Sequence, residues 1–176
     1  VVFAQQSIVN VNAEANFNNA LKLYNNKAYA TAQKTFAIVE ISASPKSNLM
    51  ADANYYNAMC GIKLNQTNAD KKVLAFVENY PASNKKNKAF FNVGNYYFAN
   101  KKAAYALKWY QKVNLDGLSK ENQKEINFKM GYSLLVAKRL DLAKDKFLPL
   151  INDAKYGNDS RYYYGYISYK LEDYGV

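Results

Sequence analysis

The chain has 176 residues, 49% of them hydrophobic and 22% charged, and its 24 Lys and Arg residues exceed its 14 Asp and Glu residues, giving a formal net charge of +10. It has no histidine and a single cysteine, Cys60, which excludes an intrachain disulfide, a cysteine metal cluster, a histidine-based zinc site and a catalytic centre built on histidine. Neither the P-loop pattern nor the GxGxxG pattern is present. We therefore expect a protein that is not an enzyme, with no catalytic residue, cofactor or metal ion.

The N-terminal residues VVFAQQS resemble the end of an apolar segment closed by a small residue, as at a secretory cleavage site after Ala4. A short strand or a ragged terminus is the alternative. We interpret residues 1–12 as a signal-peptide remnant or N-terminal extension, and we expect an exported protein that is periplasmic or associated with an outer membrane. A lone cysteine is consistent with export, because stray thiols are avoided in oxidising compartments.

From residue 13 onward, apolar residues recur at three- and four-residue steps, which is the period of helices with one buried face. Polar breaks divide these segments into antiparallel pairs. The predicted hairpins are residues 12–39, residues 48–80, residues 88–113, a fourth from the candidate N-cap Ser119 to Leu150, and a fifth first helix from about residue 158. No alternating pattern of strand length is present, so we expect an all-α fold.

Residues that end or begin helices support these boundaries. Pro45 and Pro81 follow the first two hairpins, and Ser83 is a candidate N-cap for the third. Pro149 predicts a kink or an early end in the second helix of the fourth hairpin.

The hairpins share a repeated spacing. A small residue of the first helix recurs at steps of 34 to 38 residues, at Ala20, Ala58, Gly94, Gly131 and Gly165. A second small residue follows twelve positions later at Ala32, Ala106 and Ala143, and a large apolar residue four positions after that at Phe36, Tyr110 and Phe147. Gly94 predicts a close approach of another backbone, with Ala106 as the matching small surface.

The second hairpin departs from this spacing. Asp70 stands where its second small residue belongs, so we expect its second helix, around Val73, Leu74 and Val77, to be shifted or shortened. Cys60 follows Ala58 in an apolar helix, and we expect a small buried thiol there.

This spacing resembles the tetratricopeptide repeat, whose pattern has a small residue at position eight, a tyrosine-like residue at eleven, alanine at twenty, an aromatic at twenty-four and proline near thirty-two. The segment NYPAS, Asn79–Ser83, resembles the repeats of bacterial periplasmic accessory proteins of the Tol-Pal type and of outer-membrane-assembly lipoproteins. The chain departs from the family at position eleven, which is tyrosine only at Tyr97, and lacks its first-helix tryptophan. The resemblance implies a right-handed superhelical solenoid of antiparallel helix hairpins over residues 13–176, with about four and a half repeats. Because the fifth copy lacks its second helix, we expect the solenoid to continue beyond residue 176.

In the tetratricopeptide family the first helices line a concave groove. The residues that the resemblance assigns to this groove are Phe17, Tyr24, Tyr55, Met59, Phe91, Asn95, Phe98, Phe128, Tyr132, Tyr162, Tyr166 and Tyr169. Aromatic rings on a rigid scaffold offer a large contact area at little entropic cost, as peptide and protein binding require. The alternative is that several of them pack between neighbouring hairpins. The clamp lysine that holds a terminal carboxylate in some relatives is replaced by Phe or Tyr, so we expect no such ligand.

The resemblance therefore implies a non-enzymatic scaffold that binds a protein or extended peptide, with no nucleic acid expected. Two alternatives remain open. One is binding of an anionic glycan or membrane surface through lysine-rich turns such as Lys101–Lys102 and Lys138–Arg139, which are otherwise solvated helix ends. The other is a regulatory domain of a larger protein whose effector module follows residue 176. The partner and the oligomeric state do not follow from the sequence.

Overall fold

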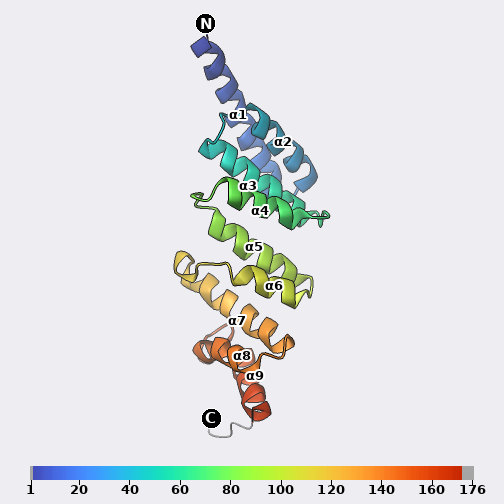
Figure 1. The fold of residues 1–176 in the computed structure, drawn as a ribbon, viewed down its shortest axis with the longest axis vertical. Coiled ribbons are helices and arrows are strands. Elements are labelled where there is room, and N and C mark those ends of the chain that lie inside the picture. Colours follow the sequence, from blue (N-terminus) through green and yellow to red (C-terminus); the bar gives the residue numbers. More distant parts are fainter. Residues whose placement is uncertain (1, 172–176) are drawn as a thin grey trace. The chain divides into compact units, whose positions relative to one another are not determined.

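The computed structural model describes the backbone of residues 2–171 and the side chains of residues 12–171. Every regular element in residues 2–171 is helical, which confirms the all-α expectation (Figure 1). The elements are α1 (Val2–Asn25), α2 (Tyr29–Ser42), α3 (Asn48–Lys63), α4 (Ala69–Asn79), α5 (Lys86–Ala99), α6 (Ala103–Tyr110), η1 (Leu115–Gly117), α7 (Lys120–Val136), α8 (Leu140–Phe147), η2 (Leu148–Leu150) and α9 (Gly157–Lys170).

The chain divides into two compact units, residues 1–89 (unit 1) and residues 90–176 (unit 2), and the division falls within α5. In unit 1, α1 packs on α2, α2 on α3 and α3 on α4. In unit 2, α6 packs on α7, α7 on α8 and α8 on α9. The ring of Phe90 in α5 lies 6.0 Å from that of Trp109 in α6. Each unit is thus built from sequential helix hairpins.

The N-terminal residues expected to form a separate extension belong to α1, which begins at Val2. The cleavage after Ala4 stays a prediction. Val1 and residues 172–176, together with the expected continuation of the repeats, lie outside the described residues.

Glycine in a first helix packs against an aromatic ring of the second helix in the same hairpin. A Cβ atom on Gly94 would lie 2.5 Å from Cδ1 of Tyr110, and one on Gly131 would lie 2.9 Å from Cζ of Phe147. In both hairpins the ring belongs to the residue sixteen positions after the glycine. The expectation that another backbone approaches Gly94 is wrong, because the atoms nearest to it belong to a ring, 1% exposed, rather than to Ala106.

The second hairpin is shifted, as expected. The connection from α3 to α4 covers residues 64–68, whereas α1 and α2 are joined by residues 26–28 only. The longer connection places Ala69, 5% exposed, and Val73, fully buried, at the inner face of α4. Ala69 therefore takes the place of the second small residue, and Asp70 is half-buried beside it.

Three hairpin turns share one backbone geometry. A lysine adopts the left-handed region after α1, α5 and α7, with φ of 62° at Lys27, 58° at Lys101 and 58° at Lys138. The next residue donates its N–H to the carbonyl five positions earlier, in Ala28 to Leu23, Lys102 to Tyr97 and Arg139 to Leu134, each at 2.9 Å. This is the Schellman motif, which normally places glycine at the left-handed position. Asn65, with φ of 54°, takes that position after α3.

Four of the five predicted boundary residues agree with the structure, and Pro45 and Pro81 follow the ends of α2 and α4 as expected. Ser119 caps α7, and its Oγ accepts from the N–H of Asn122 at 3.3 Å. Pro149 lies in η2 directly after α8, which ends at Phe147. Ser83 is not an N-cap, because its Oγ accepts from Lys85 at 3.2 Å while α5 begins only at Lys86. Its hydroxyl stabilises the turn Ser83–Lys86, which leads into α5.

Candidate functional site

The predicted groove residues of unit 1 lie in or against its core. Tyr55 and Met59 are 2% and 1% exposed, so their side chains offer no surface to a partner. Phe17 and Tyr24 are half-buried, and their rings lie 6.0 and 5.1 Å from that of Tyr56. Tyr56, which the repeat spacing did not single out, also stacks on the second-helix ring of Phe36 at 5.3 Å. In unit 1, the alternative of packing between hairpins accounts for all four.

In unit 2 the predicted residues change from buried to exposed along the chain. Phe91 in α5 is 7% exposed and packs with Ala106, Tyr110 and Ile126, so it also belongs to the core. Its equivalent in α9, Tyr162, is 68% exposed. The other exposed side chains of the predicted set are Tyr132 at 36%, Tyr166 at 43% and Tyr169 at 64%. Large aromatic surface is therefore available on α7 and α9.

Aromatic side chains connect the first helices of unit 2. The ring of Phe98 in α5 lies 5.7 Å from that of Tyr132 in α7, and Tyr132 lies 5.8 Å from Tyr163 in α9. Tyr163 is 5.4 Å from Tyr162 and also approaches Phe128 at 6.4 Å. We call these four residues, Phe98, Tyr132, Tyr162 and Tyr163, together with Tyr166, which lies one helical turn after Tyr162 on α9, the aromatic row.

Tyr163 is the member of the aromatic row that the repeat spacing did not predict. Burial raises the pKa of its hydroxyl, and the neighbouring Tyr132, Asp159 and Tyr162 raise it further. The hydroxyl of Tyr163 is therefore neutral at physiological pH and can both donate and accept hydrogen bonds.

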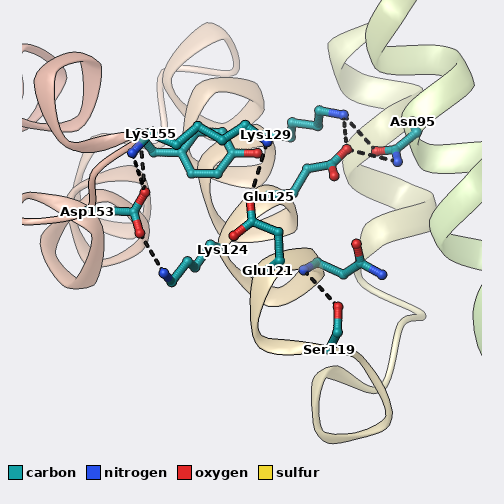
Figure 2. A network of polar contacts seen from close by, with 10 residues as sticks. Asn95, Ser119, Glu121, Lys124, Glu125, Lys129, Asp153 and Lys155 are labelled. Carbon is teal, nitrogen blue, oxygen red and sulfur yellow. Dashed lines mark hydrogen bonds and ion pairs between the residues drawn. The ribbon is translucent and has the colours of Figure 1, made fainter.

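Asn95 holds α5, α6 and α7 together beside the aromatic row. Its Oδ1 accepts from the hydroxyl of Tyr110 at 2.7 Å and from Nζ of Lys129 at 3.0 Å, and its Nδ2 donates to Glu125 at 3.1 Å. Lys129 also pairs with Glu125, as Figure 2 shows. Burial and the nearby Glu125 raise the pKa of Tyr110, so its hydroxyl stays a donor. Asn95 is thus engaged within the protein, and its role is to position α5 against α7.

A second set of charges fixes the connection that leads into α9. Nζ of Lys124 pairs with Asp153 at 2.7 Å, and Nζ of Lys155 pairs with Glu121 at 3.2 Å (Figure 2). Oδ1 of Asp153 accepts from the N–H groups of Lys155 and Tyr156 at 2.9 and 3.0 Å. The hydrogen bond from Lys124, followed by these backbone bonds, lowers the pKa of Asp153 to about 2. Asp153 is therefore charged at neutral pH and anchors α9 to α7.

Unit 1 has an open hollow of about 570 Å³ between the α2–α3 and α4–α5 connections. Its lining is Lys46, Asn48, Ala51, Asp52, Asn79, Tyr80, Pro81, Ala82, Ser83 and Asn84. Asp52 is already paired with Lys85 at 2.9 Å. The polar groups of this lining can form hydrogen bonds, but they do not form a recognisable catalytic arrangement.

Within the described residues no group of three or more Cys, Asp and Glu side chains is arranged to hold a metal ion. No helix in the part of the chain that the structure describes is both long enough and apolar enough to cross a membrane. Comparison of the chain with protein-family models and with curated proteins finds no match.

Proposed function

We propose that this chain is a non-enzymatic helical-repeat scaffold of the tetratricopeptide type, a right-handed solenoid that binds a protein or an extended peptide along the aromatic row of unit 2. We further propose that it works in a bacterial envelope after export. The export proposal rests on the apolar N-terminal residues VVFAQQS and on the full burial of the lone thiol, Cys60.

The repeat assignment is supported by two geometries that recur in step with the sequence spacing. Gly94 and Gly131 each face the aromatic residue sixteen positions later in their own hairpin. Three of the hairpin turns have the same left-handed lysine and the same hydrogen bond. Recurrence of both features favours copies of one structural unit over unrelated hairpins.

The binding proposal is carried by the exposure of the tyrosines on α7 and α9. Tyr132, Tyr162 and Tyr166 are 36%, 68% and 43% exposed. Phe91, the residue of α5 at the repeat position of Tyr162, is by contrast buried. Tyrosine combines a large, stiff ring with a hydroxyl that can satisfy a peptide backbone, which is why it is frequent at protein interfaces. The Asn95 network holds α7 against α5, and Asp153 anchors α9 to α7, so the helices that carry these rings are fixed.

Selection of a random peptide library on the full chain tests the proposal. We expect enriched peptides to lose binding to a Tyr132→Ala, Tyr162→Ala, Tyr166→Ala variant by at least about 100-fold, because aromatic hot-spot residues contribute about 2 kcal/mol or more each. Tyr105→Ala is the matched control, since Tyr105 on α6 is 57% exposed but lies outside the aromatic row. Circular dichroism confirms that each variant folds.

Two results would count against the proposal. One is a selection that enriches no peptide. The other is a set of peptides that binds the triple variant as tightly as the original chain.

A further inference from the structure

Basic side chains gather at one end of unit 2. Because α5 and α6, and then α7 and α8, are antiparallel pairs, the turns after α5 and α7 lie at the same end of the helices, where α9 also finishes (Figure 1). We call this end the basic edge. Its five basic residues are Lys101, Lys102, Lys138, Arg139 and Lys170, all exposed, and Asp141 is the only acidic residue among positions 100–105, 136–142 and 166–171.

No ion pair among the described residues of unit 2 neutralises the charges of the basic edge, and Glu172 and Asp173, which follow Lys170 in the sequence, lie outside the described residues. The ion pairs of unit 2 among the described residues are Lys124–Asp153, Lys129–Glu125 and Lys155–Glu121, all of which involve α7 or the connection before α9. None of them includes Lys101, Lys102, Lys138 or Arg139. Figure 2 shows these paired side chains, which lie along α7 and at the connection before α9. The acidic side chains Glu121, Glu125 and Asp153 are thus engaged away from the basic edge, where positive charge exceeds negative charge among the described residues.

Two aliphatic and two tyrosine side chains are exposed at the same end of unit 2. Tyr105 is 57% exposed, Val136 is 56%, Leu142 is 42% and Tyr169 is 64%. Tyr105 and Leu142 lie in the first turns of α6 and α8, and Val136 and Tyr169 lie in the last turns of α7 and α9. All four therefore belong to the same end of the helices as the basic residues.

The presence of both basic and exposed aliphatic side chains favours one class of anionic partner over the others. A nucleic acid or an anionic glycan can pair with lysine and stack on tyrosine, but neither gains from exposed Val136 and Leu142. An acidic bilayer matches both features, because its headgroups attract lysine while its interface takes up aliphatic and tyrosine side chains. We propose that the basic edge of unit 2 docks peripherally on membranes rich in acidic phospholipid.

Cosedimentation of the full chain with vesicles tests this proposal. The vesicles are phosphatidylcholine alone, or phosphatidylcholine mixed in equal parts with phosphatidylglycerol. We expect binding only to the acidic vesicles, and weaker binding at high salt.

Matched charge variants locate the surface. The edge variant combines Lys101→Gln, Lys102→Gln and Lys138→Gln, and should bind acidic vesicles about 100-fold more weakly, since each lysine at an acidic surface contributes about fivefold. The control variant combines Lys108→Gln, Lys112→Gln and Lys120→Gln, which are exposed lysines of the other half of unit 2. It removes the same charge, yet its vesicle binding should change by less than about fivefold, because charges farther than about 10 Å are screened.

The apolar contribution needs its own variant. Val136→Ser with Leu142→Ser should weaken binding to acidic vesicles while leaving retention on a heparin matrix unchanged.

Equal weakening by the edge and control variants would overturn the proposal in favour of diffuse attraction by net charge. Retention on heparin or DNA that depends on the edge lysines, without binding to acidic vesicles, would overturn it in favour of a polyanion site.

Discussion

The absence of a Cβ atom at Gly94 and Gly131 allows the two helices of each hairpin in unit 2 to pack closely. Gly94 and Gly131 lie against the rings of Tyr110 and Phe147, and a side chain at either position would overlap the ring. Tyr110 has little freedom to move, because it is 1% exposed and its hydroxyl is bonded to Asn95. Gly165 takes the same place in α9, but no atom lies within 4 Å of a Cβ built there. One residue type at one repeat position therefore has two different environments.

This difference predicts opposite effects of alanine. Gly94→Ala should lower the free energy of unfolding by about 1–2 kcal/mol, because overpacking outweighs the gain of about 1 kcal/mol in helix propensity. Gly165→Ala should raise it by about 1 kcal/mol, because only the propensity gain applies. Gly131→Ala should fall between them. Urea unfolding measures all three, and equal stability of the Gly94 and Gly165 variants would show that the Tyr110 ring yields.

The repeat spacing identified these glycines and rings because both recur within one hairpin at a constant separation, but it did not predict that they pack against each other. It did not predict the roles of Tyr56 and Tyr163, which lie against rings of neighbouring hairpins. Those contacts depend on how successive hairpins pack, which a pattern within one repeat does not contain. For the same reason the spacing did not predict that Tyr55, Met59 and Phe91, which were assigned to the groove, are buried in the core.

At the scale of whole elements, three turns between helices have lysine at the left-handed position where glycine is usual. The Schellman turn needs one residue with positive φ, and this chain supplies Lys27, Lys101 and Lys138. The sequence indicated polar breaks at these points, but not their geometry, because lysine carries no preference for the left-handed region. The same limitation applies to α4, whose start at Ala69 depends on the length of the turn before it.

Glycine should improve these turns. Lys27→Gly or Lys138→Gly removes a left-handed strain of about 1–2 kcal/mol, and the greater freedom of glycine in the unfolded chain offsets about 0.5–1 of it. We expect each variant to raise the free energy of unfolding by about 0.5–1 kcal/mol in chemical denaturation. Lys108→Gly, inside α6, is the control and should lower it by about 1 kcal/mol. Loss of stability in the turn variants would show that the lysine side chains contribute more than the strain they impose.

At the scale of the whole molecule, burial holds several ionisable groups in their neutral form. Cys60 is fully buried, as the sequence predicted, and burial raises the pKa of its thiol to about 12. Burial likewise raises the pKa of Tyr24 and of Tyr110 above its usual range. Unfolding would return each group to water, where it ionises at its ordinary pH. The folded state therefore binds more protons than the unfolded state under alkaline conditions.

Stability should accordingly fall with rising pH. The contribution of Cys60 is complete below its ordinary pKa of 9.0 and is lost as the pH rises from there towards about 12. Urea unfolding across this range should show a decline that is shallower in Cys60→Ala, by up to about 1.4 kcal/mol per pH unit. A decline of the same slope in both proteins would mean that the thiol ionises without unfolding. Slow reaction of native Cys60 with a thiol reagent at pH 8 provides an independent measure.

The glycine–ring pairs also bear on how the chain finds its structure. Gly94 and Tyr110, like Gly131 and Phe147, are separated by sixteen residues, so each pair closes when a single short loop closes. Contacts of such low sequence separation require no long search, and helical proteins dominated by them fold in microseconds to milliseconds. Each hairpin of unit 2 can therefore act as a nucleus for its own packing. Assembly should then proceed by adding neighbouring hairpins, at a rate set by local contacts rather than by the length of the chain.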